Sequence, residues 1–190
     1  MTSGSVSGWQ AFALAYFLVL LAALLAARVY RRWVDLETVR QFEELMRRRA
    51  SLYELLKILA REFNELGGHG DDILSQWLAE GPTSRPEGQA LRDVDIELEI
   101  LQDELAQVGV GRTLADPWRW LTSGVDRARA WIAGVVSART VGETRAALAA
   151  IGDEDTRRDL VRLNDWIRHF ARQHGIKEQN SFYHDSYFYV

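Results

Sequence analysis

Residues 9–29 read WQAFALAYFLVLLAALLAARV, and this apolar stretch decides how the rest of the chain is organised. Its two polar residues, Gln10 and Arg28, both lie near its ends. In a helix that rises about 1.5 Å per residue, the stretch spans about 31 Å, which is the thickness of a bilayer's hydrocarbon core. The sequence therefore predicts one transmembrane helix over residues 9–30.

The residues that flank this stretch predict its orientation. Two kinds of side chain lie at its ends: aromatic ones at Trp9 and Tyr30, and basic ones at Arg28, Arg31 and Arg32. The aromatic side chains suit the membrane interface, and the positive charge, which lies only on the C-terminal flank, predicts residues 1–8 outside and residues 31–190 in the cytoplasm. A cleaved signal peptide is the alternative, but it would need a basic segment before the apolar run, and MTSGSVSG contains none.

Composition limits the class of protein. The chain has 190 residues with 23 basic and 27 acidic ones, so its net charge of −4 argues against binding nucleic acid. It contains no cysteine, which excludes disulfides, thiolate zinc sites, iron–sulfur clusters and thiol nucleophiles. The basic residues are almost all arginine, which is typical of a GC-rich bacterial genome. Together with the predicted transmembrane helix, this bias predicts a location in the bacterial cytoplasmic membrane.

Beyond the membrane segment, apolar residues recur at intervals of three and four, as in helices that bury one face. The predicted helices cover residues 34–66, 71–80, 91–108, 114–135, 140–150 and 160–174. The glycines within residues 67–70 are expected to end the helix at 34–66 with a positive φ. Residues 81–88 are expected to form a loop. Thr140 and Glu143 are expected to form a capping box at the start of the helix at 140–150. No long alternating pattern predicts a strand. The expected fold is all-α, an antiparallel long-helix bundle over residues 31–175, followed by a C-terminal aromatic tail at 176–190.

Two stretches resemble the LemA family of bacterial membrane proteins. The first is QFEELMRRRASL at residues 41–52, with Leu56 and Phe63 beyond it, and the second is NDWIRHF at residues 164–170. Two family prolines are replaced here by Glu54 and Ala171. The resemblance implies an anchor with its N-terminus outside, a cytoplasmic bundle of long helices, and a role as scaffold or adaptor without an established enzymatic activity.

Candidate chemical sites are few. His69, Asp71 and Asp72 could approach a metal, but they lie on one turn, and the two carboxylates suit the positive end of the following helix. Asp93, Asp95, Glu97 and Glu99 have the spacing of a solvated helix face. No nucleophile elbow, phosphate-binding loop or zinc-protease motif occurs in the sequence. No catalytic residue, metal or cofactor is therefore expected.

Binding residues are easier to propose. Arg49 interrupts the apolar seam of its helix, so burial against a carboxylate of a neighbouring helix is expected, with partner contact as the alternative. The side chains expected to contact a partner are Arg47, Arg48, Trp120, Phe182, Tyr183, Tyr187, Phe188 and Tyr189. The five aromatic residues of the tail are too many for a disordered segment, and they either fold back on the bundle or dock onto another protomer or protein.

Two classes of function remain open. The first is a non-enzymatic scaffold or adaptor, LemA-like, whose partners are the lipid bilayer, further copies of the chain or other membrane proteins. The alternative is an accessory single-transmembrane subunit of a larger respiratory or photosynthetic complex. The alanines between residues 13 and 27 would allow close packing against other membrane helices in that case.

Overall fold

The computed structural model describes residues 8–152 and 154–176, and it describes side chains from residue 16 onward except at positions 83 and 87. The regular secondary structure of these residues is helical: α1 (Gly8–Gly68), α2 (Asp71–Glu80), η1 (Pro82–Ser84), α3 (Pro86–Gln107), η2 (Arg112–Leu114), α4 (Ala115–Ser137), α5 (Val141–Ala149) and α6 (Glu154–Gln173). The all-α prediction is confirmed. The chain divides into two units, residues 1–42 and 43–190.

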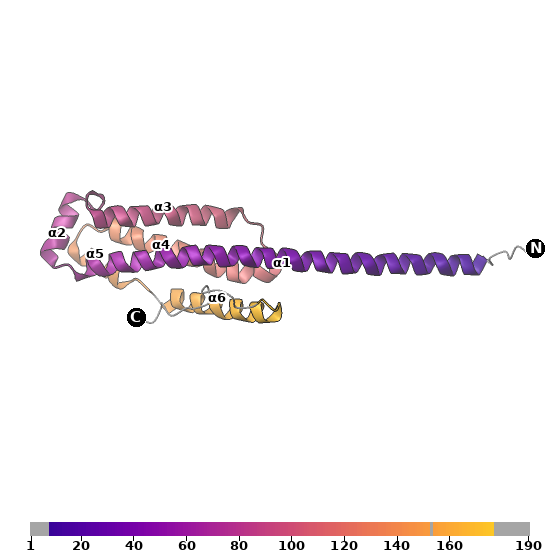
Figure 1. Ribbon diagram of the computed structural model, residues 1–190. Coiled ribbons are helices and arrows are strands. Elements are labelled where there is room, and N and C mark those ends of the chain that lie inside the picture. Colours follow the sequence, from indigo (N-terminus) through magenta and orange to yellow (C-terminus); the bar gives the residue numbers. More distant parts are fainter. Residues whose placement is uncertain (1–7, 153, 177–190) are drawn as a thin grey trace, which may run out of the picture. The chain divides into compact units, whose positions relative to one another are not determined.

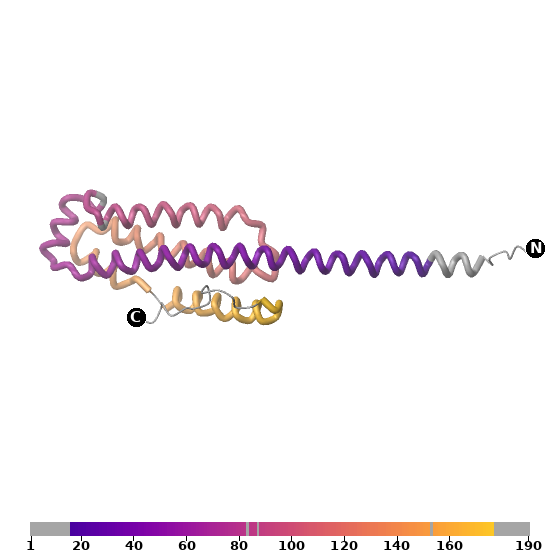
Figure 2. The backbone as a smooth tube through the Cα atoms, in the orientation of Figure 1, coloured from indigo at the N-terminus to yellow at the C-terminus, as the bar shows by residue number. Residues whose placement is uncertain are grey.

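The second unit is a bundle of long helices with two short ones at one end (Figure 1). The backbone trace in Figure 2 shows α3 running opposite to the C-terminal part of α1, α4 returning, and α6 running back again. α4 lies between α3 and α6 and packs against both. At the end of the bundle α5 contacts α2, where Arg145 donates to the Asp71 carboxylate at 2.8 Å and to the His69 carbonyl at 3.0 Å.

The core consists of the predicted apolar seams. Nearly fully buried side chains repeat at helical spacing on α1 (Leu45, Leu52, Leu59, Leu66), α3 (Leu91, Leu98, Leu105), α4 (Leu121, Val125, Ile132) and α6 (Leu160, Leu163, Ile167). Each such side chain contributes about 1.5–3 kcal/mol by leaving water. Gly124 of α4 lies close to α1, because a Cβ at this position would be only 3.1 Å from a methyl carbon of Leu52.

Helix boundaries mostly follow the prediction, and the differences have local causes. α1 continues without a break from Gly8 to Gly68 because neither proline nor glycine occurs between residues 9 and 66. The loop predicted at 81–88 is shorter, since η1 occupies part of it and Pro86 begins α3 at a position where proline suits a helix. Thr140 caps α5 as expected, accepting from the Glu143 amide at 3.2 Å.

The prediction of positive φ at the end of α1 is wrong. Gly67 and Gly68 remain helical, and Gly70 is extended at φ −68° and ψ 163°, a conformation open to any residue. Among the described residues, the glycines with positive φ are Gly81, Gly152 and Gly175, which follow α2, α5 and α6. Glycine therefore ends these three helices in the expected manner, but not α1.

Within the part of the chain whose side chains are described, no helix combines the length and hydropathy required to cross a bilayer. Residues 9–15 of the predicted span lie outside that part. The transmembrane helix over residues 9–30 therefore stays a prediction.

Candidate functional site

A buried polar cluster joins α1 to α6. Arg49 is only 4% exposed although it carries a positive charge. Its Nε and Nη2 donate to the side-chain oxygen of Asn164 at 3.0 and 2.8 Å, and its guanidinium lies over the ring of Tyr53, 4.5 Å from the centroid. The Tyr53 hydroxyl and the Asn164 amide also lie within hydrogen-bonding distance, at 3.1–3.2 Å. The cluster thus combines charge-assisted hydrogen bonds with a cation–π contact.

The expected burial of Arg49 is confirmed, and the acceptor that the structure describes is an amide oxygen from α6. Arg49 belongs to the stretch at residues 41–52 and Asn164 to the stretch at 164–170. The two stretches that carry the family resemblance therefore meet in space, although 115 residues separate the two side chains along the chain.

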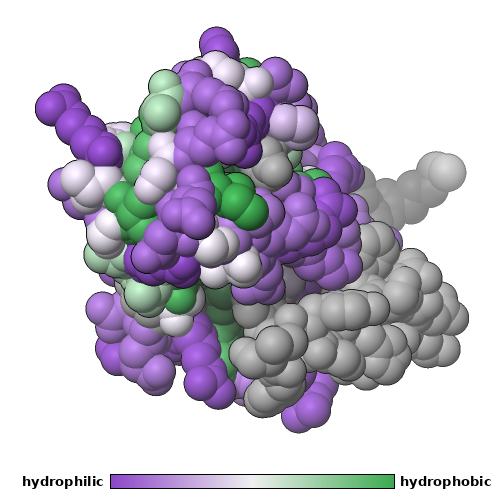
Figure 3. Space-filling model, turned by 90° about the vertical axis from the view of Figure 1, so that its left-hand side faces the viewer, coloured by the Kyte–Doolittle hydropathy of each residue, from purple (hydrophilic) through white to green (hydrophobic). Residues whose placement is uncertain are grey.

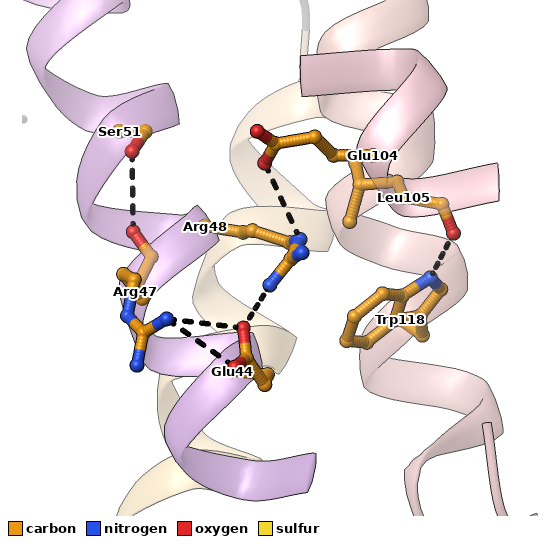
Figure 4. A network of polar contacts seen from close by, with 7 residues as sticks. All are labelled: Glu44, Arg47, Arg48, Ser51, Glu104, Leu105 and Trp118. Carbon is orange, nitrogen blue, oxygen red and sulfur yellow. Dashed lines mark hydrogen bonds and ion pairs between the residues drawn. The ribbon is translucent and has the colours of Figure 1, made fainter. Parts of the chain in front are cut away.

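A second cluster, drawn in Figure 4, joins α1 to α3 and α4. The Arg48 side chain is 15% exposed; it forms an ion pair with Glu44 on its own helix and another with Glu104 of α3 at 3.6 Å. Its guanidinium also lies 5.9 Å from the ring centroid of Trp118, whose indole N–H donates to the Leu105 carbonyl at 3.1 Å. These contacts place Arg48 inside the bundle, where it links three helices.

The other residues predicted to contact a partner have different surroundings. Arg47 pairs with Glu44 at 3.2 Å but keeps its side chain 72% exposed, so it remains accessible. Trp120 is half-buried on α4. Tail residues Phe182, Tyr183, Tyr187, Phe188 and Tyr189 lie outside the described residues.

An open groove of about 360 Å³ runs between α3 and α4 and is lined by charged and small side chains. Arg129 donates to Asp95 at 3.0 Å and to Gln102 at 2.6 Å, and Gln102 in turn donates to Asp126 at 2.6 Å. The hydrogen bond that Arg129 donates to Asp95 raises the pKa of Arg129, and the charges of the nearby carboxylates raise it further, so the guanidinium stays charged. The acidic face of α3 was expected to be simply solvated, yet Asp95 and Glu99 both pair with this arginine.

Acidic and histidine side chains do not converge on a metal site within the described residues. Asp71 forms an ion pair with Arg145, and His174 stacks on Phe170 with ring centroids 4.2 Å apart. Hydrophilic side chains cover most of the end of the bundle that carries α2 and α5, with hydrophobic ones visible between them (Figure 3).

Sequence reasoning missed Tyr53, Asn164 and Arg129 as parts of polar clusters. Arg49 alone carried a signal, because a charge on an apolar seam needs a buried acceptor somewhere. The acceptor itself could not be identified from helix periodicity. Comparison of the chain with protein-family models, curated proteins and solved structures finds no match.

Proposed function

We propose that this chain is a non-enzymatic, LemA-like scaffold or adaptor, anchored in the bacterial cytoplasmic membrane by the N-terminal part of α1 and acting through protein–protein contacts on the cytoplasmic side. The observation that carries the anchor is the surface of α1 between Tyr16 and Val29. Large apolar side chains occupy every face of the helix there, and those from Tyr16 to Leu21 are consecutive and 43–66% exposed. A helix that is apolar all round is typical of a membrane span.

The scaffold role is supported by how the polar residues of the bundle are used. Arg48, Arg49 and Arg129 each connect two or more helices through ion pairs or hydrogen bonds. These side chains hold the bundle in one arrangement instead of converging on a shared reactive centre. The contact between the two LemA-like stretches, through Arg49 and Asn164, also supports the resemblance as a structural one.

Membrane association is tested by fractionating cells and washing the membranes with alkaline carbonate. The unmodified full chain is expected to stay in the membrane pellet. The double variant Leu21→Arg with Leu24→Arg is expected to be released from the membrane, because inserting each arginine at mid-bilayer costs about 2.5–3.5 kcal/mol. Ile96→Arg with Ile100→Arg is the control, since these α3 residues are also exposed and apolar, at 46% and 49% against 43% for Leu21 and 68% for Leu24. Release of the unmodified chain by carbonate would refute the anchor.

Orientation, partners and the role of the tail need three further measurements. Protease added outside spheroplasts should leave residues 31–190 intact, and digestion of this region would reverse the proposed topology. The mass of the detergent-extracted particle separates a homo-oligomer from an accessory subunit, which would carry a fixed set of foreign chains. Deleting residues 181–190 should weaken assembly while the melting temperature changes little, whereas a large fall in melting temperature alone would assign the tail to the core.

A further inference from the structure

Three apolar side chains form a line on α1 immediately after the proposed anchor. Val29, Trp33 and Leu36 are spaced by four and three residues, and they are 68%, 61% and 63% exposed. Residues spaced in this way lie on one face of a helix. Ala22 and Ala26 extend the same line toward the N-terminus. We name these five residues the α1 stripe.

The cytoplasmic end of the α1 stripe extends beyond the lipid. Leu36 follows Ala27, the last residue before the first arginine, by nine positions, or about 14 Å along the helix axis. The headgroup layer on each side of the hydrocarbon core is only about 5–8 Å thick. Given the proposed anchor, Leu36 therefore lies in water, and exposed apolar residues that repeat at 4-3 spacing are the pattern of a helix that pairs with another helix.

We infer that the partner is a second copy of this chain, which packs in parallel along the α1 stripe as a short coiled coil continuous with the membrane helix. Two copies with the same topology cross the membrane in the same direction, so their α1 helices can only pair in parallel. The small side chains of Ala22 and Ala26 permit the close approach that membrane helices need. Val29, Trp33 and Leu36 then bury their apolar surface against the partner.

The charges beside the stripe match this arrangement. With Val29 and Leu36 at the d positions and Trp33 at an a position, Arg32 occupies a g position and Glu37 the following e position. In a parallel dimer, a g residue faces the e residue that lies five positions later on the partner. Arg32 of each copy therefore faces Glu37 of the other, which gives two symmetrical ion pairs. Within one chain Glu37 is 3.8 Å from Arg40 and accepts a hydrogen bond from Gln41 at 3.2 Å, both on its own helix, and its side chain is 39% exposed.

The absence of cysteine from the sequence permits a clean crosslinking test in membranes. Full-length chains carrying Val29→Cys or Leu36→Cys are oxidised and compared with the matched controls Val34→Cys and Thr38→Cys, which lie on the opposite face of α1. Stripe positions should give at least about fivefold more disulfide-linked dimer, because a disulfide needs Cα atoms within about 7 Å. Equal crosslinking at all four positions, or a maximum at the controls, would overturn the inference.

Charge reversal provides a second criterion. Arg32→Glu should lower crosslinking through Leu36→Cys, since each new carboxylate would face Glu37 of the other copy, and adding Glu37→Arg should restore it. Failure of the double reversal to restore dimers would contradict the predicted register.

The inference rests on the proposed anchoring, so the same samples are washed with carbonate. A chain that stays in the pellet without the expected crosslinking pattern refutes the pairing alone. A chain released from the pellet that keeps the pattern refutes the anchor and retains the pairing.

Discussion

Replacing Asn164 by leucine tests whether the α1–α6 polar cluster stabilises the bundle. The substitution removes the oxygen that accepts from Arg49 Nε at 3.0 Å and from Nη2 at 2.8 Å. Hydrogen bonds to a charged group contribute about 1.5–3 kcal/mol each, and because these two share one acceptor their loss is less than additive. We therefore expect Asn164→Leu to lower the free energy of unfolding by about 2–4 kcal/mol.

The double variant makes this expectation specific. Arg49→Met combined with Asn164→Leu replaces the buried polar pair by apolar groups of similar size, a change that is often neutral. The double variant should therefore be more stable than Asn164→Leu alone, even though it carries one more substitution. Asn164→Asp is the matched control, because it keeps an acceptor for the guanidinium.

Unfolding is measured on the full chain in detergent, by circular dichroism during heating and during denaturation with urea. For a chain of this size 1 kcal/mol corresponds to about 2–4 °C, so the melting temperature of Asn164→Leu should fall by roughly 4–16 °C. If the free energy of unfolding lost in the double variant equals the sum of the losses in Arg49→Met and Asn164→Leu, the two residues are not energetically coupled, and the reasoning fails.

Two further predictions concern other parts of the bundle. Gly124→Ala should destabilise the protein by up to about 2 kcal/mol, because overpacking against Leu52 costs about 1–3 kcal/mol and the higher helix propensity of alanine returns about 1 kcal/mol. Gly142→Ala, whose Cβ would meet no atom within 4 Å, should stabilise the protein slightly. Equal melting temperatures of the two variants would contradict close packing of α1 on α4. The hydrogen bond that Arg85 donates lowers the pKa of Glu80 in the folded protein below its ordinary 4.5. The contact therefore stabilises the folded protein fully at pH values above the pKa of Glu80 in the unfolded chain, and this stabilisation is lost as the pH falls through the lower pKa of the folded protein. Carboxyl NMR titration should show the pKa of Glu80 rising in Arg85→Gln, and an unchanged midpoint would reject the contact.

Much of the candidate site depended on contacts that sequence periodicity does not encode. Arg48 was expected to contact a partner, as part of the basic run at residues 47–49. It lies instead between Glu44, Glu104 and Trp118, because α3 and α4 pack against this part of α1. Arg47, one residue earlier, points elsewhere and stays exposed, since successive helix positions differ by about 100°.

The sequence by itself determined the helices and their buried faces. Apolar spacing and glycine breaks are local signals, so the bounds of α2 and the burial of Leu52, Leu98 and Leu121 follow from them directly. Only the tertiary structure decided that Arg49 meets Asn164. A charge on an apolar seam requires an acceptor, but every neighbouring helix offers several, and the choice among them depends on how the seams pack.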